Sequence, residues 1–109
     1  MAERRTDVVG EVYLLHFDQP YEHAKHYTGW SEDHQRRLQE HLSGKGSPLV
    51  RAVVEAGIGV VVARVWPGET RRFERRLKKR KNAPRACPIC QRKRAERAML
   101  EQEMVLEVA

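Results

Sequence analysis

The stretch from His26 to Gly44 reads HYTGWSEDHQRRLQEHLSG, and it follows an apolar segment that contains Tyr13. Its first five residues are short and aromatic, which is typical of a strand paired with the segment before it. Ser31 then stands where a helix cap is expected, because its hydroxyl can accept hydrogen bonds from the first free N–H groups, and two acids follow it. We therefore predict a strand over 26–30 and a helix that is capped by Ser31 and stops at Gly44.

Apolar patterning and turn residues predict the rest of the chain. The polar segment 18–25 contains Pro20, which favours a connecting loop over a tight two-residue hairpin turn. The run 58–66 is almost continuously apolar and β-branched, as in a central strand or one covered on both faces. A turn at Pro67 and Gly68 follows it. The predicted elements are a strand over 8–17, a loop over 18–25, a helix from Ser47 to Gly57 with Pro48 in its first turn, a strand over 58–66 and a basic helix over 69–81.

This order of elements predicts an α/β fold, a small sandwich around a three-stranded antiparallel sheet. The chain has 109 residues, which suits one domain with one core. We expect a flexible N-terminus over 1–9, a compact domain over 10–85, and a tail over 86–109. Pro84 and Pro88 prevent the basic helix from continuing. The tail has helical composition and is either a docked helix or a frayed end.

Positive charge is concentrated in one part of the chain. Residues 71–97 hold 13 Lys and Arg against two acids, whereas the whole chain has a net charge of +6. Such segregation favours a polyanionic partner, although a solvated helix face is the simpler alternative. The sequence offers neither a membrane-spanning run nor an apolar leader, and the basic stretch has too few bulky apolar residues for a membrane-lying helix. We expect a cytoplasmic protein.

Four patches of sequence stand out together: VYLL at 12–15, YTG at 27–29, RRLQEH at 36–41 and FERRLK at 73–78. In this order they resemble the motifs of the GIY-YIG nuclease superfamily. The similarity covers about residues 10–85 and is closest to small bacterial single-domain members. It implies a GIY-YIG-like sandwich with helices flanking a three-stranded antiparallel sheet, and a DNA endonuclease of the kind used in repair or recombination.

The resemblance also implies roles for individual residues. Tyr13 corresponds to the tyrosine that orients or deprotonates the attacking water, and Tyr27 to the second tyrosine. Arg37 corresponds to the arginine that contacts the scissile phosphate, His41 to a histidine of the same helix, and Glu74 to the single ligand of Mg²⁺ or Mn²⁺. A phenol with a pKa near 10 needs nearby positive charge to act as a base at neutral pH.

The motifs depart from the family pattern in two places. Glu11-Val12-Tyr13 replaces Gly-Ile-Tyr, and Tyr27-Thr28-Gly29 replaces Tyr-Ile-Gly. Many members place an asparagine well beyond the glutamate, and here only Asn82 is available. The predicted DNA-binding residues are Arg36, Lys78, Lys79, Arg80, Lys81 and Asn82.

The function predicted from these residues is metal-dependent hydrolysis of DNA without a small-molecule cofactor. Two alternatives stay open. The first is a catalytically inactive nucleic-acid-binding module on the same scaffold, and the second is a basic protein-interaction domain.

A second motif, Cys87-Pro88-Ile89-Cys90, resembles the cysteine turn of zinc ribbons and rubredoxins, in which both thiolates face one metal. A structural Zn²⁺ site needs four ligands, so two more would come from His16, His23, His26, His34 and His41, or from a second chain. A reduced pair of free thiols is the favoured interpretation from sequence, and a stable disulfide is the least favoured.

Overall fold

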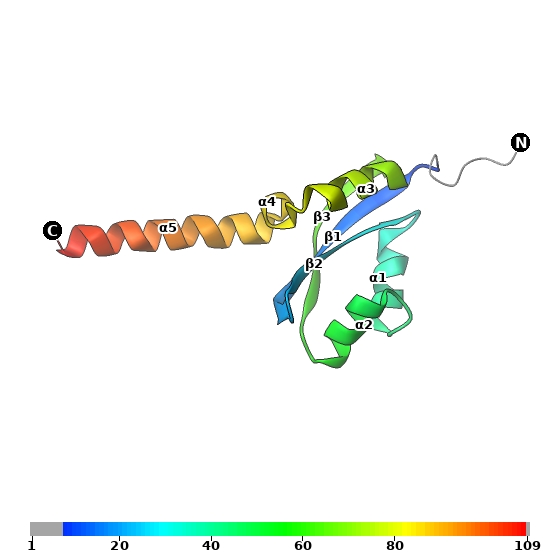
Figure 1. Cartoon of the computed structure of the whole chain (residues 1–109), viewed down its shortest axis with the longest axis horizontal. Helices are drawn as coiled ribbons and strands as arrows, with labels where there is room; N and C mark the ends of the chain where they lie inside the picture. The colour runs from blue at the N-terminus through cyan, green and yellow to red at the C-terminus, as the bar shows by residue number, and fades with distance from the viewer. Residues whose placement is uncertain (1–7, 109) are drawn as a thin grey trace, which may run out of the picture.

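Three antiparallel strands form one sheet in the order β2–β1–β3 (Figure 1). The strands are β1 (Gly10–Tyr21), β2 (Ala24–Ser31) and β3 (Val60–Glu69). The computed structural model describes residues 8–108, so most of the segment 1–9 that was predicted to be flexible lies outside the described residues. The predicted α/β class and the three-stranded antiparallel sheet are confirmed.

The central strand is β1, and every residue from Val12 to Phe17 in it is buried. The prediction that the apolar run 58–66 is a central or doubly covered strand was wrong. β3 pairs only with β1, and its valines alternate between the core and the surface, with Val61 42% exposed. A run of β-branched residues therefore reflects strand propensity here more than burial on both faces.

β3 also continues through the predicted turn at Pro67 and Gly68. Pro67 pairs with Glu11, and the register shifts by one residue before Gly10 pairs with Glu69. Gly68 takes a positive φ of 72° at this irregularity, a conformation that glycine adopts without a Cβ penalty. The strand bends here instead of ending, so the basic helix begins at Arg71 and not at Glu69.

The segment predicted as a loop over 18–25 is mostly strand. β1 runs to Tyr21 and β2 starts at Ala24, so the connection is the tight two-residue turn that the prediction excluded. Glu22 has a φ of 54°, which such turns require. Pro20 is tolerated because the pairing register shifts between His16 and Tyr21, where its missing N–H interrupts no regular ladder.

Two short helices, α1 (His34–Leu42) and α2 (Pro48–Glu55), lie on one side of the sheet (Figure 1). Asp33 and not Ser31 caps α1, because its carboxylate accepts hydrogen bonds from the N–H groups of Gln35 and Arg36. Helix α2 is capped by Ser47 as predicted, but ends before Gly57. The core between these helices and the sheet contains Tyr13, Leu15, Phe17, Val50 and Val53.

The basic segment forms three successive helices, α3 (Arg71–Arg80), α4 (Ala83–Ala86) and α5 (Pro88–Val108). The prolines stop α3 as expected, and each proline then begins or opens a new helix. Helix α5 projects from the rest of the chain (Figure 1), and the molecule measures 70 × 29 × 21 Å. Within the described residues, none of the helices combines the length and apolar character needed to span a bilayer.

Candidate active site and metal centre

Strands β1 and β2 place Tyr13 and Tyr27 on the same face of the sheet. Directly paired residues of antiparallel strands share a face, and the register pairs Tyr13 with Gly29 and Leu15 with Tyr27. The two phenol rings have centroids 6.3 Å apart. A Cβ at Gly29 would collide with the Tyr13 ring and hydroxyl, so glycine here leaves the space that the phenol occupies.

Helix α1 supplies His41 to the same place. Its Nε2 lies 2.9 Å from the Tyr13 hydroxyl, and its ring centroid lies 5.3 Å from that of Tyr27. The backbone N–H of Ser47 donates to His41 Nδ1 at 3.1 Å. Nδ1 therefore has no proton, and in the neutral imidazole Nε2 carries it and donates to the Tyr13 oxygen.

Arg37 lies one helical turn before His41. Its guanidinium lies near enough to the Tyr13 hydroxyl to lower the pKa of that phenol, and Nη1 donates to the Glu40 carboxylate at 2.7 Å. The Tyr13 oxygen thus has His41 as its hydrogen-bond partner and the positive charge of Arg37 nearby. A cleft of about 480 Å³ beside them is lined by Trp30, Ser31, Glu32, Arg36, Arg37, Glu40 and Arg71.

Helix α3 packs against β2 and places Glu74 near Tyr13. The Glu74 side chain is only 15% exposed, and its carboxylate lies 4.0 Å from Lys78 Nζ. Lys78 Nζ in turn lies 5.5 Å from the centroid of the Tyr27 ring. The charge of Glu74 is close enough to raise the pKa of Tyr13. The structure therefore brings the five predicted residues Tyr13, Tyr27, Arg37, His41 and Glu74 together from four elements.

The protonation states at this cluster follow from burial. Burial raises the pKa of Tyr13 well above 10, Tyr27 and Glu74 add to the effect, and the positive charge of Arg37 opposes it. Burial, with the Arg37 charge second, lowers the pKa of His41. At neutral pH Tyr13 is a phenol and His41 a neutral imidazole. Arg37 alone therefore does not supply the positive charge that a Tyr13 base was predicted to need.

The predicted DNA-binding residues lie at two places. Arg36 is on α1, is exposed, and lies 4.0 Å from Glu40. Lys78, Lys79 and Arg80 form the last turn of α3, and Lys81 ends that helix with a φ of 50°. Asn82 occupies the cap position of α4, beyond the end of the helix that carries Glu74. Sequence reasoning had no signal for Glu40 as the partner of Arg37, or for the hydrogen bond from Ser47.

The other face of the sheet holds a second cluster, made by His16, His26, Cys87 and Cys90. One ligand atom from each residue lies within 4.8 Å of the other three. His16 and His26 are directly paired across β1 and β2, so both imidazoles leave the same face. Cys87 ends the linker after α4, and Cys90 lies in the first turn of α5. We call the segment Cys87–Cys90 the knuckle.

Imidazole and thiolate ligands suit Zn²⁺, whereas Mg²⁺ prefers oxygen ligands. The other histidines considered from sequence are engaged elsewhere or exposed. His34 Nδ1 lies 2.8 Å from Glu11, His41 contacts Tyr13, and His23 is exposed in the hairpin turn. Cys87 and Cys90 are free thiols and form no disulfide with each other. The cross-strand pairing of His16 and His26 is the signal that would have selected them.

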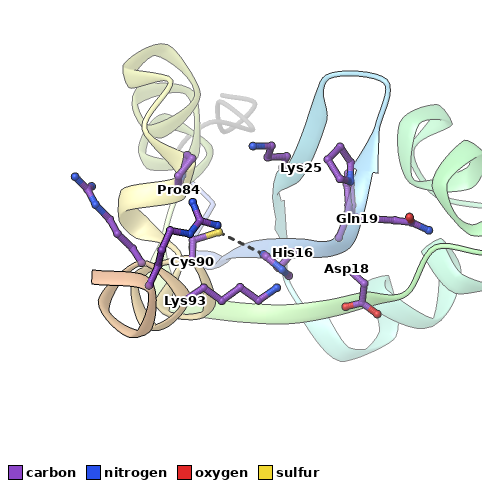
Figure 2. A pocket seen from close by; sticks show the side chains of 11 residues that line it. His16, Asp18, Gln19, Lys25, Pro84, Cys90 and Lys93 are labelled. Atoms are coloured by element: carbon purple, nitrogen blue, oxygen red, sulfur yellow. Dashed lines mark hydrogen bonds between the residues drawn. The ribbon is translucent and has the colours of Figure 1, made fainter. Parts of the chain in front are cut away.

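A cleft of about 510 Å³ adjoins this second cluster. Figure 2 shows Cys90 and His16 at its wall, with Lys25 and Lys93 beside them and Asp18 below. The cleft lies between the β1–β2 hairpin and the start of α5.

No protein-family model, no curated protein and no solved structure matches this chain.

Proposed function

We propose that this protein is a metal-dependent DNA endonuclease that hydrolyses a phosphodiester bond with a GIY-YIG-type site. The observation that carries the proposal is the convergence of two phenols, a guanidinium, an imidazole and a carboxylate around Tyr13. These residues are separated by up to 61 positions in the chain, between Tyr13 and Glu74, and they come from separate patches of the sequence. If these residues were only strand aromatics and parts of a solvated helix face, nothing would require their side chains to lie close together.

The chain's own residues would divide the work as follows. Tyr13, a phenol whose oxygen accepts a hydrogen bond from His41, keeps its own proton free to orient an attacking water. Arg37 stabilises the negative charge that develops on the phosphate in the transition state. His41 fixes the position of the Tyr13 hydroxyl. Lys78 and the exposed bases after it contact the phosphate backbone.

Glu74 would hold the divalent ion, Mg²⁺ or Mn²⁺. The donor set fits, because Mg²⁺ commonly takes one or two protein carboxylates and completes its shell with water and phosphate oxygens. When bound, such an ion polarises the phosphoryl oxygen and adds positive charge beside the phenols. A mostly buried carboxylate whose cation partner is as far as 4.0 Å leaves its oxygens available for this role.

The inactive nucleic-acid-binding module is the second candidate. The contact that favours it is the 2.7 Å bond from Arg37 to Glu40, since a guanidinium already paired with a carboxylate is less available to a phosphate. In this alternative the bases of α3 bind DNA without turnover.

Cleavage assays on duplex, branched and single-stranded DNA, with Mg²⁺ or with a chelator, test the proposal. We expect cleavage only with metal, and Glu74→Gln or Arg37→Ala to reduce its rate by about 100-fold or more. Both residues are at least partly exposed, so circular dichroism should show folded variants.

The helical pair Arg51 and Glu55, joined at 3.0 Å on α2, offers matched controls. Arg51→Ala and Glu55→Gln remove the same charges away from Tyr13 and should leave the rate within about twofold. Metal-dependent cleavage that survives in both Glu74→Gln and Arg37→Ala contradicts the assigned site. DNA binding without cleavage under any condition favours the inactive module.

A further inference from the structure

Four of the six distances between ligand atoms of the second cluster are close to those of a closed tetrahedral metal site, and the other two are no longer than 4.8 Å. Cys87 Sγ and Cys90 Sγ lie 3.5 and 3.6 Å from His16 Nδ1, and Cys90 Sγ lies 3.3 Å from His26 Nε2. The two imidazole nitrogens are 3.3 Å apart. With Zn–S bonds of about 2.3 Å and Zn–N bonds of about 2.0–2.1 Å, a regular tetrahedron has S···N edges of about 3.5–3.6 Å and an N···N edge of about 3.3–3.4 Å.

The backbone prepares both halves of the cluster. The ladder between β1 and β2 fixes the histidine pair, whose ring planes meet at 64°. Pro88 starts α5 directly after Cys87. The backbone N–H of Cys90 donates a hydrogen bond to Cys87 Sγ, with 3.5 Å between nitrogen and sulfur. Such a bond orients the first sulfur toward the second cysteine, as the turn of a zinc knuckle requires.

Burial indicates a structural site and not a catalytic one. Cys87 is fully buried and His16 is 6% exposed. Four protein ligands complete a tetrahedral shell, so no position stays open for water or substrate. A pair of thiols kept only for packing would not need two imidazole nitrogens aimed at the same point.

Helix α5 has little else to hold its start against the sheet. Every residue from Gln91 to Met104 is exposed, so this part of the helix buries almost no apolar surface beyond the knuckle. A fastening at Cys87 and Cys90 would explain why the helix meets the sheet at all, because few apolar contacts leave an element prone to local opening.

We propose that His16, His26, Cys87 and Cys90 bind one Zn²⁺ that fastens the knuckle and the start of α5 to the sheet. This ion is distinct from the one assigned to Glu74 in its ligands, its face of the sheet and its role. The proposal does not rest on nuclease activity.

Metal analysis of the purified full-length chain is the first test. After dialysis against buffer with trace Zn²⁺, we expect one zinc per chain by mass spectrometry. Replacement by Co²⁺ should give the visible bands of a tetrahedral site with thiolate-to-cobalt charge transfer. Both thiols should resist a thiol reagent until a strong chelator is added, and chelation should lower the melting temperature reversibly.

Two variants locate the ligands. Cys90→Ser and His26→Gln should each lower zinc affinity by at least 10-fold. In the cobalt-substituted protein, Cys90→Ser should also weaken the thiolate-to-cobalt charge-transfer band. His23→Gln, an exposed histidine of the same hairpin, is the matched control and should bind one zinc as the parent does.

Three outcomes overturn the proposal, and the first two need no variant. They are thiols that react at the same rate with and without zinc, one zinc shared by two chains in a dimer, and full zinc binding by both ligand variants. Because these measurements detect the metal, failure here and failure of DNA cleavage are separate results.

Discussion

At the scale of single residues, the loop between α1 and α2 decides what His41 can do. Gly46 comes so close to the imidazole that a Cβ there would collide with Nδ1, and this approach lets the Ser47 N–H reach that nitrogen. The proton of neutral His41 is therefore held on Nε2, facing Tyr13. Protonation of His41 would put a second proton opposite the Ser47 N–H and leave a donor facing a donor.

The buried neutral state of His41 predicts a pH dependence of stability. Its pKa is lowered in the fold by burial and then by Arg37, while the unfolded chain keeps a value near 6.5. Below that pH the unfolded state binds more protons, so the free energy of unfolding should fall as the pH decreases from 6.5 toward the folded pKa. The groups that face the imidazole are Tyr13, Tyr27, Arg37 and Glu40.

Urea unfolding at a series of pH values, with and without His41→Gln, measures this effect. The difference between the two curves isolates His41, because the other histidines contribute equally to both. We expect the difference in the free energy of unfolding between the parent and His41→Gln to become smaller as the pH falls below 6.5. A difference that stays constant between pH 5 and 8 contradicts a lowered folded pKa.

At the scale of elements, the start of α1 separates what the sequence specifies from what tertiary contacts decide. The helix, its leucines and its approximate start were predictable. The sequence, however, has two residues that could cap it, Ser31 and Asp33, two positions apart. Ser31 is buried at the end of β2, where its hydroxyl bonds to Asp33, so Asp33 is left to cap the helix. β2 extends to Ser31, one residue beyond the predicted strand, and for this reason Asp33 and not Ser31 caps the helix.

The cap assignment predicts unequal effects of two neighbouring substitutions. Asp33→Ala removes the acceptor for the N–H groups of Gln35 and Arg36 and should lower the free energy of unfolding by about 1 kcal/mol. Glu32→Ala removes an exposed acid beside it and should change stability by less than about 0.5 kcal/mol. Chemical denaturation checks both, and equal effects would show that Asp33 is not the cap.

The hairpin and β3 illustrate the same limit. Pro20 and the polar residues around it look like a loop because local propensity does not register the pairing of Tyr21 with Ala24, which extends the hairpin beyond them. The valines of 58–66 suggest a central strand because high strand propensity and burial on both faces both produce a run of β-branched apolar residues. The cluster around Tyr13 was predictable from separate patches of sequence. The pairing of His16 with His26 depends on the register of β1 and β2, which the expected loop obscured.

At the scale of the whole molecule, α5 makes the chain elongated. The radius of gyration is 17.0 Å, whereas a compact chain of this length has about 13 Å. Helices α3, α4 and the first turns of α5 follow one another along one side (Figure 1), so the charge that the sequence concentrates in 71–97 is also gathered in space. Met99, Leu100 and Met104 are more than half exposed on the projecting part.

Truncation after Arg97 tests whether α5 projects as one helix. The helical residues from 98 to 108 span about 16 Å at 1.5 Å per residue. Small-angle X-ray scattering should therefore show a maximum dimension shorter by about that amount. The melting temperature should change little, since the deleted residues with described side chains are exposed. An unchanged maximum dimension would mean that the helix folds back onto the domain.

Strand β1 carries Tyr13 and His16 three positions apart, so alternation along the strand sends them to opposite faces. The two centres consequently share one stretch of backbone, and neither can be moved without the other. Deletion of a single residue between positions 13 and 16 would turn the His16 side chain toward the face that carries the tyrosines. Cys87 and Cys90 would then lose His16 as a neighbour. The spacing between Tyr13 and His16 is therefore constrained from both faces of the sheet.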